Sequence, residues 1–204
     1  MKVLMINGSP NAKGCTYTAL QELAKVLHEE GIETEIIHVG NQAIRGCIAC
    51  DHCRKQEGCV FEDIVNETAA KFKACDGLIV GSPVYYASAN GTLIAYLDRL
   101  FHSVKMDKRM KVGAAIVSAR RGGNTATFDE LNKYFTISQM PIVSSQYWNM
   151  VHGFTPEDVL KDEEGLQTMR TLGRNMAFLL KAIALAKEQY GLPATEKRIA
   201  TNFI

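Results

Sequence analysis

Hydrophobic and polar residues follow two different patterns along this chain. Short, nearly continuous apolar runs predict buried strands at residues 2–7, 33–39, 77–81, 111–118 and 141–147. Between them, apolar side chains recur every three or four positions. This spacing predicts helices over residues 16–30, 62–74 and 163–190, around 93–101, and up to about 138. Strands that alternate with amphipathic helices indicate an α/β protein with a parallel sheet.

Five parallel strands joined by right-handed crossovers form a doubly wound sheet with helices on both faces. In such sheets, ligands bind beyond the carboxyl ends of the strands. Three loops leave these ends, at residues 8–15, 82–88 and 119–124, so we expect the chemistry there. The predicted organisation is one domain of residues 1–190 with a cysteine-rich loop at 44–60, followed by an extended tail at 191–204.

The composition is that of an ordinary globular protein. Of its 204 residues, 47% are hydrophobic and 22% are charged. A net charge of +1 gives no reason to expect nucleic acid or a membrane as a partner. The first apolar run is too short for a signal peptide and leads into a glycine turn, so we expect a cytoplasmic protein.

Four of the six cysteines lie close together, in the spacing C-x2-C-x2-C-x5-C. These candidate metal ligands are Cys47, Cys50, Cys53 and Cys59. Close thiolates in a reducing compartment suit an iron–sulfur cluster or a structural zinc ion. Zinc usually joins two pairs of ligands over a longer spacer, and His52 is more typical of a solvated loop residue than of a zinc ligand. Free thiols are the third alternative.

The other two cysteines lie outside this motif. Cys75 follows a predicted helix and precedes a predicted strand, which is typical of a buried structural thiol. Cys15 lies near the start of a predicted helix, where we expect a lowered thiol pKa.

The first loop opens a helix, so its backbone N–H groups and the helix dipole favour an anion. Its sequence matches neither the dinucleotide pattern G-x-G-x-x-G nor the P-loop pattern. Hydroxyl and amide side chains in and beside the loop suit a phosphate monoester. The candidate ligands of this segment are Ser9, Asn11, Cys15, Thr16, Tyr17 and Thr18. The alternative is an N-capped helix that follows a plain turn.

The second and third loops hold groups that suit a flavin ring, which needs a flat apolar or aromatic face and polar atoms at its edge. The candidates are Pro83, Val84, Tyr85 and Tyr86 in the second loop, and Ser118, Arg120, Arg121 and Gly122 at the third. An arginine near the pyrimidine edge would stabilise negative charge on the reduced ring, and glycine lets the backbone approach a ligand. Half-buried tyrosines and a solvated turn are the alternatives.

Taken together, the three loops resemble those of the flavodoxin-like family of NAD(P)H-dependent FMN reductases. The matching residues are Gly8-Ser9-Pro10, Gly14-Cys15-Thr16, Ser82-Pro83-Val84-Tyr85-Tyr86 and Asp98-Arg99. With the four cysteines added, the chain is similar to the iron–sulfur flavoprotein branch. This resemblance implies a flavodoxin-like fold, FMN, and a [4Fe–4S] cluster close to the flavin. The chain departs from its relatives at Asn11, at Cys15 and in the alanine-rich loop 87–91.

The function that the resemblance implies is an FMN-dependent oxidoreductase, linked to NAD(P)H or ferredoxin, whose cluster relays electrons to or from FMN. The expected partners are small molecules or redox proteins, and NAD(P)H is one candidate donor. Because the flavin supplies the redox chemistry, we expect no catalytic side chain. Purification in air can remove the cluster. The resemblance also implies a homodimer or higher homo-oligomer.

Three other functions remain open at this point. One is an NAD(P)H-dependent FMN or quinone reductase without a cluster, in which the cysteine loop is only structural. Another is a non-catalytic electron carrier similar to flavodoxin. The third is a zinc-stabilised binding module with an empty flavin site.

Overall fold

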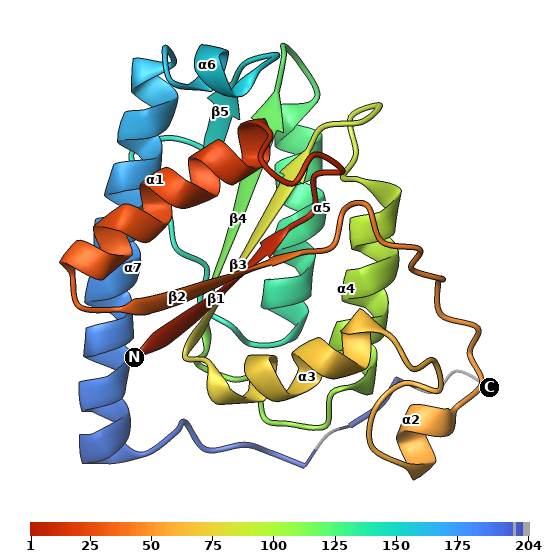
Figure 1. The fold of residues 1–204 in the computed structure, drawn as a ribbon. Coiled ribbons are helices and arrows are strands. Elements are labelled where there is room, and N and C mark those ends of the chain that lie inside the picture. The colour runs from red at the N-terminus through yellow and green to blue at the C-terminus, as the bar shows by residue number, and fades with distance from the viewer. Residues whose placement is uncertain (198, 202–204) are drawn as a thin grey trace.

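The computed structural model describes residues 1–197 and 199–201 and has a five-stranded parallel sheet at its centre (Figure 1). The strands are β1 (Lys2–Asn7), β2 (Glu33–His38), β3 (Gly77–Pro83), β4 (Val112–Ala119) and β5 (Met150–His152). Their order across the sheet is β2-β1-β3-β4-β5, and each neighbouring pair is parallel. This is the flavodoxin-like order, whose switch point lies between β1 and β3. The predicted fold class is confirmed.

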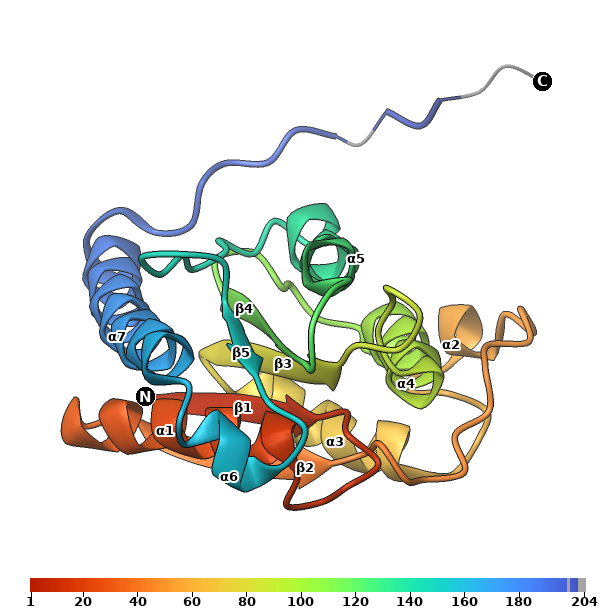
Figure 2. The same ribbon diagram turned by 90° about the horizontal axis from the view of Figure 1, so that it is seen from above.

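Helices cover both faces of the sheet, α1 and α7 on one face and α3, α4 and α5 on the other (Figure 2). Their bounds are α1 (Cys15–Glu29), α2 (His52–Lys55), α3 (Ile64–Ala74), α4 (Gly91–Ser103), α5 (Asn124–Ile137), α6 (Pro156–Val159) and α7 (Glu163–Tyr190). The long helices match the predicted segments. The sequence pattern did not predict α2 and α6, because one turn is too short to show a helical period.

The core has two parts, one on each face of the sheet. In β1, Val3 and Met5 pack against α1 and α7, while Leu4 and Ile6 pack on the other face against α3 and α4. All four side chains are fully buried. A strand that is buried on both faces reads as a continuous apolar run, and this is why the central strands could be predicted from the sequence.

The fifth strand does not lie where the sequence pattern placed it. Residues 141–147 contribute only an isolated bridge, between Ile142 and Gly113, and β5 forms later in the chain. Asn149 accounts for the offset. Its Nδ2 donates to the backbone oxygens of Ala115 in β4 (3.1 Å) and of Val143 (3.4 Å). This side chain takes the place of a ladder hydrogen bond, so regular pairing with β4 begins only after it.

Helix α7 ends at Gly191, whose φ of 74° turns the chain away from the helix. The described part of the tail then extends from the body of the protein (Figure 2). It is held at its start by Arg109, whose Nη1 donates to the backbone oxygen of Pro193 at 3.0 Å. The division into a domain of residues 1–190 and a tail stays a prediction. Among the described residues, no helix is long and apolar enough to cross a membrane.

Candidate functional site

The loops that follow β1, β3 and β4 lie together at the carboxyl edge of the sheet (Figure 1). Hydrogen bonds join them: the backbone N–H of Gly8 donates to Gly81 O at 2.8 Å, and that of Val84 donates to Ser118 O at 2.9 Å. Asn90, at the start of α4, donates from Nδ2 to Gly8 O at 2.7 Å. The structure therefore brings the three sequence-predicted loops to one place.

Asn7 fixes the shape of the first loop, and sequence reasoning missed it. Its Oδ1 accepts from the backbone N–H of Ser9 at 3.1 Å, and its Nδ2 donates to Ala12 O at 3.0 Å. Ser9 Oγ in turn accepts from the N–H of Asn11 at 3.2 Å. Asn7 is fully buried, and its bond with the N–H of Ser9 is shielded from water. The available signal was an asparagine at the last position of a strand, before a glycine turn.

Two helices start at this edge with glycine caps, α1 after Gly14 and α5 after Gly123. Within the described chain, neither helix has a side-chain cap or an acidic residue in its first turn. The other long helices are capped by the side chains of Asp63, Asn90 and Asp162. Free N–H groups at the positive end of a helix dipole attract anions and acceptor atoms. This edge therefore suits a ligand that is rich in oxygen.

Several predicted phosphate ligands brace the first loop from inside the protein. The hydroxyl oxygens of Thr16 and Ser118 lie 2.8 Å apart, and both side chains are buried. Thr18 Oγ1 donates to the backbone oxygen of Gly14 at 3.2 Å. These hydroxyl groups hold the start of α1 in place, and each oxygen keeps further acceptor capacity.

The other predicted residues of this segment differ in exposure. Ser9 is buried, Asn11 is exposed and Tyr17 is half-buried. Cys15 Sγ points toward the far side of α1, where it donates to Gly153 O at 3.7 Å. Burial raises the pKa of the Cys15 thiol, and its own backbone N–H offsets this only in part. The predicted lowering of this pKa is wrong, because the side chain packs against the core.

The second loop contains a tight turn with strained backbone. Tyr85 and Ser88 exchange two backbone hydrogen bonds, of 2.9 and 3.0 Å, around Tyr86 and Ala87. These two residues have left-handed φ values of 51° and 60°, which cost an L-residue about 1 kcal/mol each. Glu130 of α5 anchors the turn by accepting from Ser88 Oγ and from the next backbone N–H, both at 2.8 Å. Strain of this kind is common where a protein holds a ligand.

The remaining predicted flavin contacts surround this turn, and all are exposed or half-buried. They are Pro83, Val84, Tyr85, Tyr86, Arg120, Arg121 and Gly122. Gly123 shows how closely the second and third loops approach, since a Cβ there would lie 2.9 Å from the Cα of Ala87. At Gly122, by contrast, such a Cβ would have no heavy atom of the described chain within 4 Å, apart from Gly122 itself and its two chain neighbours. The backbone at Gly122 therefore faces open space.

The four cysteines of the motif line one cavity, between the long loop after β2 and helix α4. The cavity wall also includes Phe61, Arg99, His102 and Ser103. All four cysteines are free thiols, two of them exposed and two half-buried. Among the residues that the structure describes, no three His, Cys, Asp or Glu side chains converge closely enough to hold a single metal ion. The four thiols line this small cavity, of about 30 Å³, without meeting at one point.

Arg99 joins this cavity to α4, and its side chain is only 1% exposed. Its Nε donates to Cys59 Sγ at 3.2 Å, and its two terminal nitrogens donate to the Asp63 carboxylate at 2.6 and 3.0 Å. Nη1 also donates to Arg45 O at 3.2 Å, and the guanidinium lies 5.0 Å from the ring centre of Phe61. In the sequence, Arg99 stands out only as part of the family resemblance.

The cysteine cavity lies along α4, away from the carboxyl edge of the sheet. Arg99, His102 and Ser103 belong to the last turns of α4, which begins at Gly91. At 1.5 Å per residue, Arg99 lies about 12 Å along the helix from Gly91. The cysteine loop leaves β2 at the carboxyl edge and then carries α2 toward the other end of α4 (Figure 1).

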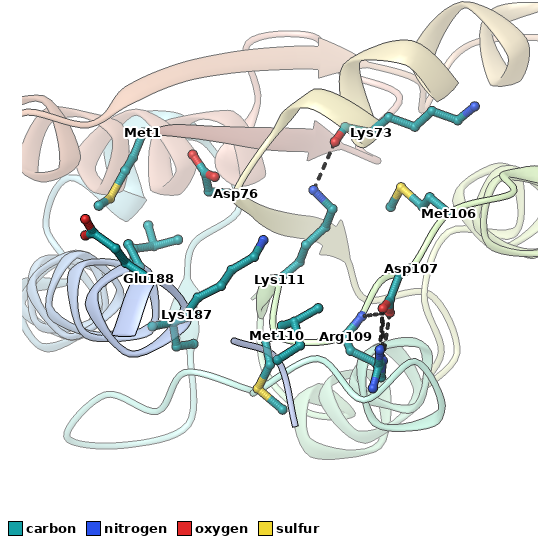
Figure 3. Close-up of a pocket in the computed structure, with 14 residues that line it drawn as sticks. Met1, Lys73, Asp76, Met106, Asp107, Arg109, Met110, Lys111, Lys187 and Glu188 are labelled. Atoms are coloured by element: carbon teal, nitrogen blue, oxygen red, sulfur yellow. Dashed lines mark hydrogen bonds and ion pairs between the residues drawn. The ribbon is translucent and has the colours of Figure 1, made fainter. Parts of the chain in front are cut away.

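Another hollow, of about 550 Å³, lies at the opposite edge of the sheet, between the start of β4 and the end of α7 (Figure 3). Some of its charged groups bond to neighbouring groups. Lys111 Nζ donates to Lys73 O at 3.0 Å, and Arg109 forms an ion pair of 2.6 Å with Asp107. Of the described residues that line this hollow, none was a candidate from the sequence.

Comparisons with known proteins give matches in sequence. The sequence model of a family described as NADPH-dependent FMN reductase matches residues 1–155. An iron–sulfur flavoprotein of Methanocaldococcus jannaschii is 35% identical over 191 residues, covering 90% of this chain and 99% of the relative. An iron–sulfur flavoprotein of Methanosarcina thermophila is 30% identical over 187 residues, covering 90% of this chain and 97% of the relative.

Solved structures show a similar fold at low sequence identity. RosB with bound 8-demethyl-8-formylriboflavin-5'-phosphate has a TM-score of 0.70 at 15% identity, covering 99% of this chain and 92% of RosB. A flavodoxin from Archaea has a TM-score of 0.60 at 15% identity, covering 89% of this chain and 99% of the flavodoxin. These likenesses concern the fold, which is flavodoxin-like.

Proposed function

The chain belongs to the NADPH-dependent FMN reductase family, in its iron–sulfur flavoprotein branch, and from this premise we propose how this FMN-dependent oxidoreductase holds its redox groups. FMN binds at the carboxyl edge of the sheet, across the three loops. A [4Fe–4S] cluster binds to the four cysteines of the loop after β2. Electrons then pass between a donor and an acceptor by way of both groups.

The donor set at the carboxyl edge supports the flavin part of this proposal. The N–H groups at the start of α1 suit the phosphate, together with Ser9, Asn11 and Thr18. Cys15, Thr16 and Tyr17 flank and brace this position. Bound flavin supplies hydride and single-electron chemistry.

Residues of the second and third loops position the flavin ring. Tyr85 and Tyr86 offer exposed aromatic surface for stacking. Arg120 and Arg121 bring positive charge to the ring, which favours its reduced, anionic form. The open backbone at Gly122 allows the third loop to approach the ring closely. No side chain of this chain needs to act as an acid or a base.

The four-thiolate donor set and the relatives named iron–sulfur flavoprotein support a cluster over a single zinc ion. Zinc requires four ligands within about 2.3 Å of one point, whereas the thiols of a cubane surround a space and bind separate iron atoms. The four cysteines line one small cavity of about 30 Å³. Ser103 adds to the fit, since this residue lines the cavity and its buried Oγ has no hydrogen-bond partner in the described part of the chain. The observation that carries the proposal is this cavity, in a chain of a flavin reductase family.

The proposal also names an electron donor, an electron acceptor and an oligomeric state. Electrons come from NAD(P)H or from a reduced ferredoxin, and the acceptor is a small molecule or a redox protein. The exposed turn around Tyr86 leaves the flavin edge accessible to either kind of donor. The working form is a homodimer or higher homo-oligomer in the cytoplasm.

Purification without oxygen tests the two redox groups together. We expect a visible spectrum of flavin plus cluster, with iron, sulfide and FMN in the ratio of one [4Fe–4S] cluster to one flavin. The variants Cys53→Ser and Cys59→Ser should lose iron and keep FMN. Cys75→Ala is the matched control, because Cys75 is buried outside the cavity and should leave both groups in place.

Other outcomes identify the alternative functions. Rapid NAD(P)H oxidation by protein that holds FMN but no iron would indicate a reductase without a cluster. Negligible turnover with NAD(P)H and fast exchange with ferredoxin would indicate an electron carrier. Zinc in place of iron would indicate that the cysteine loop is a structural zinc site.

Protein that releases no FMN on denaturation and takes up none on addition would overturn the proposal.

A further inference from the structure

Arg99 is a buried cation whose hydrogen bonds run in two opposite directions. One side of the guanidinium donates to the Asp63 carboxylate through two nitrogens. The other side donates from Nε to the sulfur of Cys59. A guanidinium cannot be deprotonated in a protein. The positive end of this ion pair therefore faces the cysteine cavity permanently.

Ser103 is a second and independent observation on the same helix. It lies four residues after Arg99, so the two side chains share one face of α4. Ser103 is 2% exposed and lines the cysteine cavity, and no partner for its Oγ is present in residues 1–197 and 199–201. A buried hydroxyl without a partner costs about 1–3 kcal/mol. The hydroxyl group of Ser103 is therefore an unpaired hydrogen-bond donor beside the cavity.

We propose that Arg99 and Ser103 are positioning residues for the cluster, which donate hydrogen bonds to its sulfur shell and raise its reduction potential. This inference rests on the proposed function, because it requires the four cysteines to hold a [4Fe–4S] cluster. The electrostatic reason is simple. Reduction adds one electron to the cluster and neither makes nor breaks a bond, so a nearby positive charge and N–H or O–H donors stabilise the reduced form.

Asp63 supplies the opposite effect and makes the inference testable. Its carboxylate faces Arg99 from the side away from Cys59 and partly cancels the positive charge that the cavity experiences. Removal of this carboxylate should therefore raise the cluster potential, whereas removal of the guanidinium should lower it. If Arg99 only anchored the loop, both changes would loosen the loop and shift the potential in the same direction.

The experiment is a potentiometric titration with dithionite, on protein whose cluster has been loaded without oxygen. Arg99→Gln should shift the reduction equilibrium of the cluster by roughly tenfold, or about 59 mV, toward the oxidised form. Arg99→Lys keeps the charge and should shift it less. Ser103→Ala should shift it in the same direction as Arg99→Gln. Asp63→Asn, which retains an acceptor for the cap of α3, should shift it in the opposite direction.

Three controls distinguish a specific effect of Arg99 on the cluster from a general effect of charge or of loop stability. Arg54→Gln also removes one positive charge from the cysteine loop, but the Arg54 side chain is 70% exposed, so its charge is screened and the shift should be small. The potential of FMN in the same samples should stay constant. Limited proteolysis within residues 46–58 of cluster-free protein measures the anchoring of the loop separately from the potential.

The outcomes are distinct. Opposite shifts in Arg99→Gln and Asp63→Asn support the proposal, and equal shifts or none overturn it. If Arg99→Gln does not load a cluster, the sign of the shift in Asp63→Asn decides. A shift in Arg54→Gln as large as that in Arg99→Gln also overturns it. Wild-type protein that takes up no iron and sulfide refutes the cluster itself, which is a different result from a loaded protein that is insensitive to Arg99.

Discussion

The hydroxyl oxygens of Thr16 and Ser118 lie 2.8 Å apart, although the two residues are separated by 102 positions in the chain. Thr16 is in the first turn of α1, and Ser118 is near the end of β4. Strand β3 lies between β1 and β4, so the contact passes over it. Gly81 of β3 permits this, since a Cβ at Gly81 would lie 2.8 Å from Thr16 Cγ2. The pair thus fixes the first loop relative to the third.

A double-mutant cycle on this pair measures its contribution to stability. Thr16→Val should lower the free energy of unfolding by about 1–2 kcal/mol, because it leaves the buried hydroxyl of Ser118 without its partner. Ser118→Ala should cost a similar amount. The double variant should lose much less than the sum, because both polar groups are then absent. Urea unfolding of the FMN-free protein gives the values, and strict additivity would contradict the internal role of these hydroxyls.

Gly122→Ala should weaken FMN binding and leave the stability of the FMN-free protein unchanged. Apart from Gly122 itself and its two chain neighbours, the described chain has no heavy atom within 4 Å of the new methyl group, so a bound ligand is what it would displace. We expect a roughly fivefold or larger rise in Kd, which corresponds to about 1 kcal/mol, by fluorescence titration. Gly123→Ala is the contrast, because its φ of 88° and its contact with Ala87 should also reduce stability. Unchanged affinity in Gly122→Ala would remove the third loop from the flavin site.

Glu130→Ala should release the strained turn that presents Tyr86. The variant loses the acceptor for Ser88 Oγ and for the backbone N–H of Ala89. The turn then relaxes from its left-handed conformation, and we expect FMN to dissociate several-fold faster in a dilution experiment followed by flavin fluorescence. Asp129→Ala is the matched control, because the neighbouring side chain is exposed. Equal rates in both variants would show that the turn is not part of the flavin site.

The stability of the protein should depend on pH through Glu35. Its carboxylate accepts from Lys2 at 2.7 Å and from Lys71 at 2.6 Å, and these bonds lower its pKa in the folded state. A lowered pKa means that the stabilisation is present at pH 7 and is lost as the pH falls below about 4. Glu35→Gln should therefore be less stable by about 0.5 kcal/mol at pH 7 and indistinguishable from the wild type near pH 3. A difference that grows as the pH falls would contradict this.

The central sheet and the long helices could be predicted because their signals are local. The apolar run at residues 2–7 became β1, and the apolar spacing at residues 163–190 became α7 with the same bounds. The fifth strand could not be predicted, because its start depends on the hydrogen bond from Asn149 to a strand that is distant in sequence. The apolar stretch at residues 141–147, which precedes β5, has the sequence pattern of a strand.

The candidate site divides in the same way. Glycine loops and cysteine spacing are visible in the sequence, so the three loops and the four thiols could be named in advance. The role of Arg99 could not be predicted. Its helix position between Leu97 and Leu100 does not indicate that its side chain will bind Asp63 and Cys59. The position of the cysteine loop along α4 was also missed, since loop length alone does not give direction.

The glycine caps of α1 and α5 also bear on how long this protein survives in a cell. Flavin that binds the N–H groups there would stabilise the folded state by about 2.7 kcal/mol at a hundredfold excess over its Kd. Such a gain lowers the unfolded fraction about a hundredfold, and proteases act on that fraction. Cells short of riboflavin should therefore degrade the newly made chain before it accumulates, so the abundance of the protein itself would follow vitamin supply.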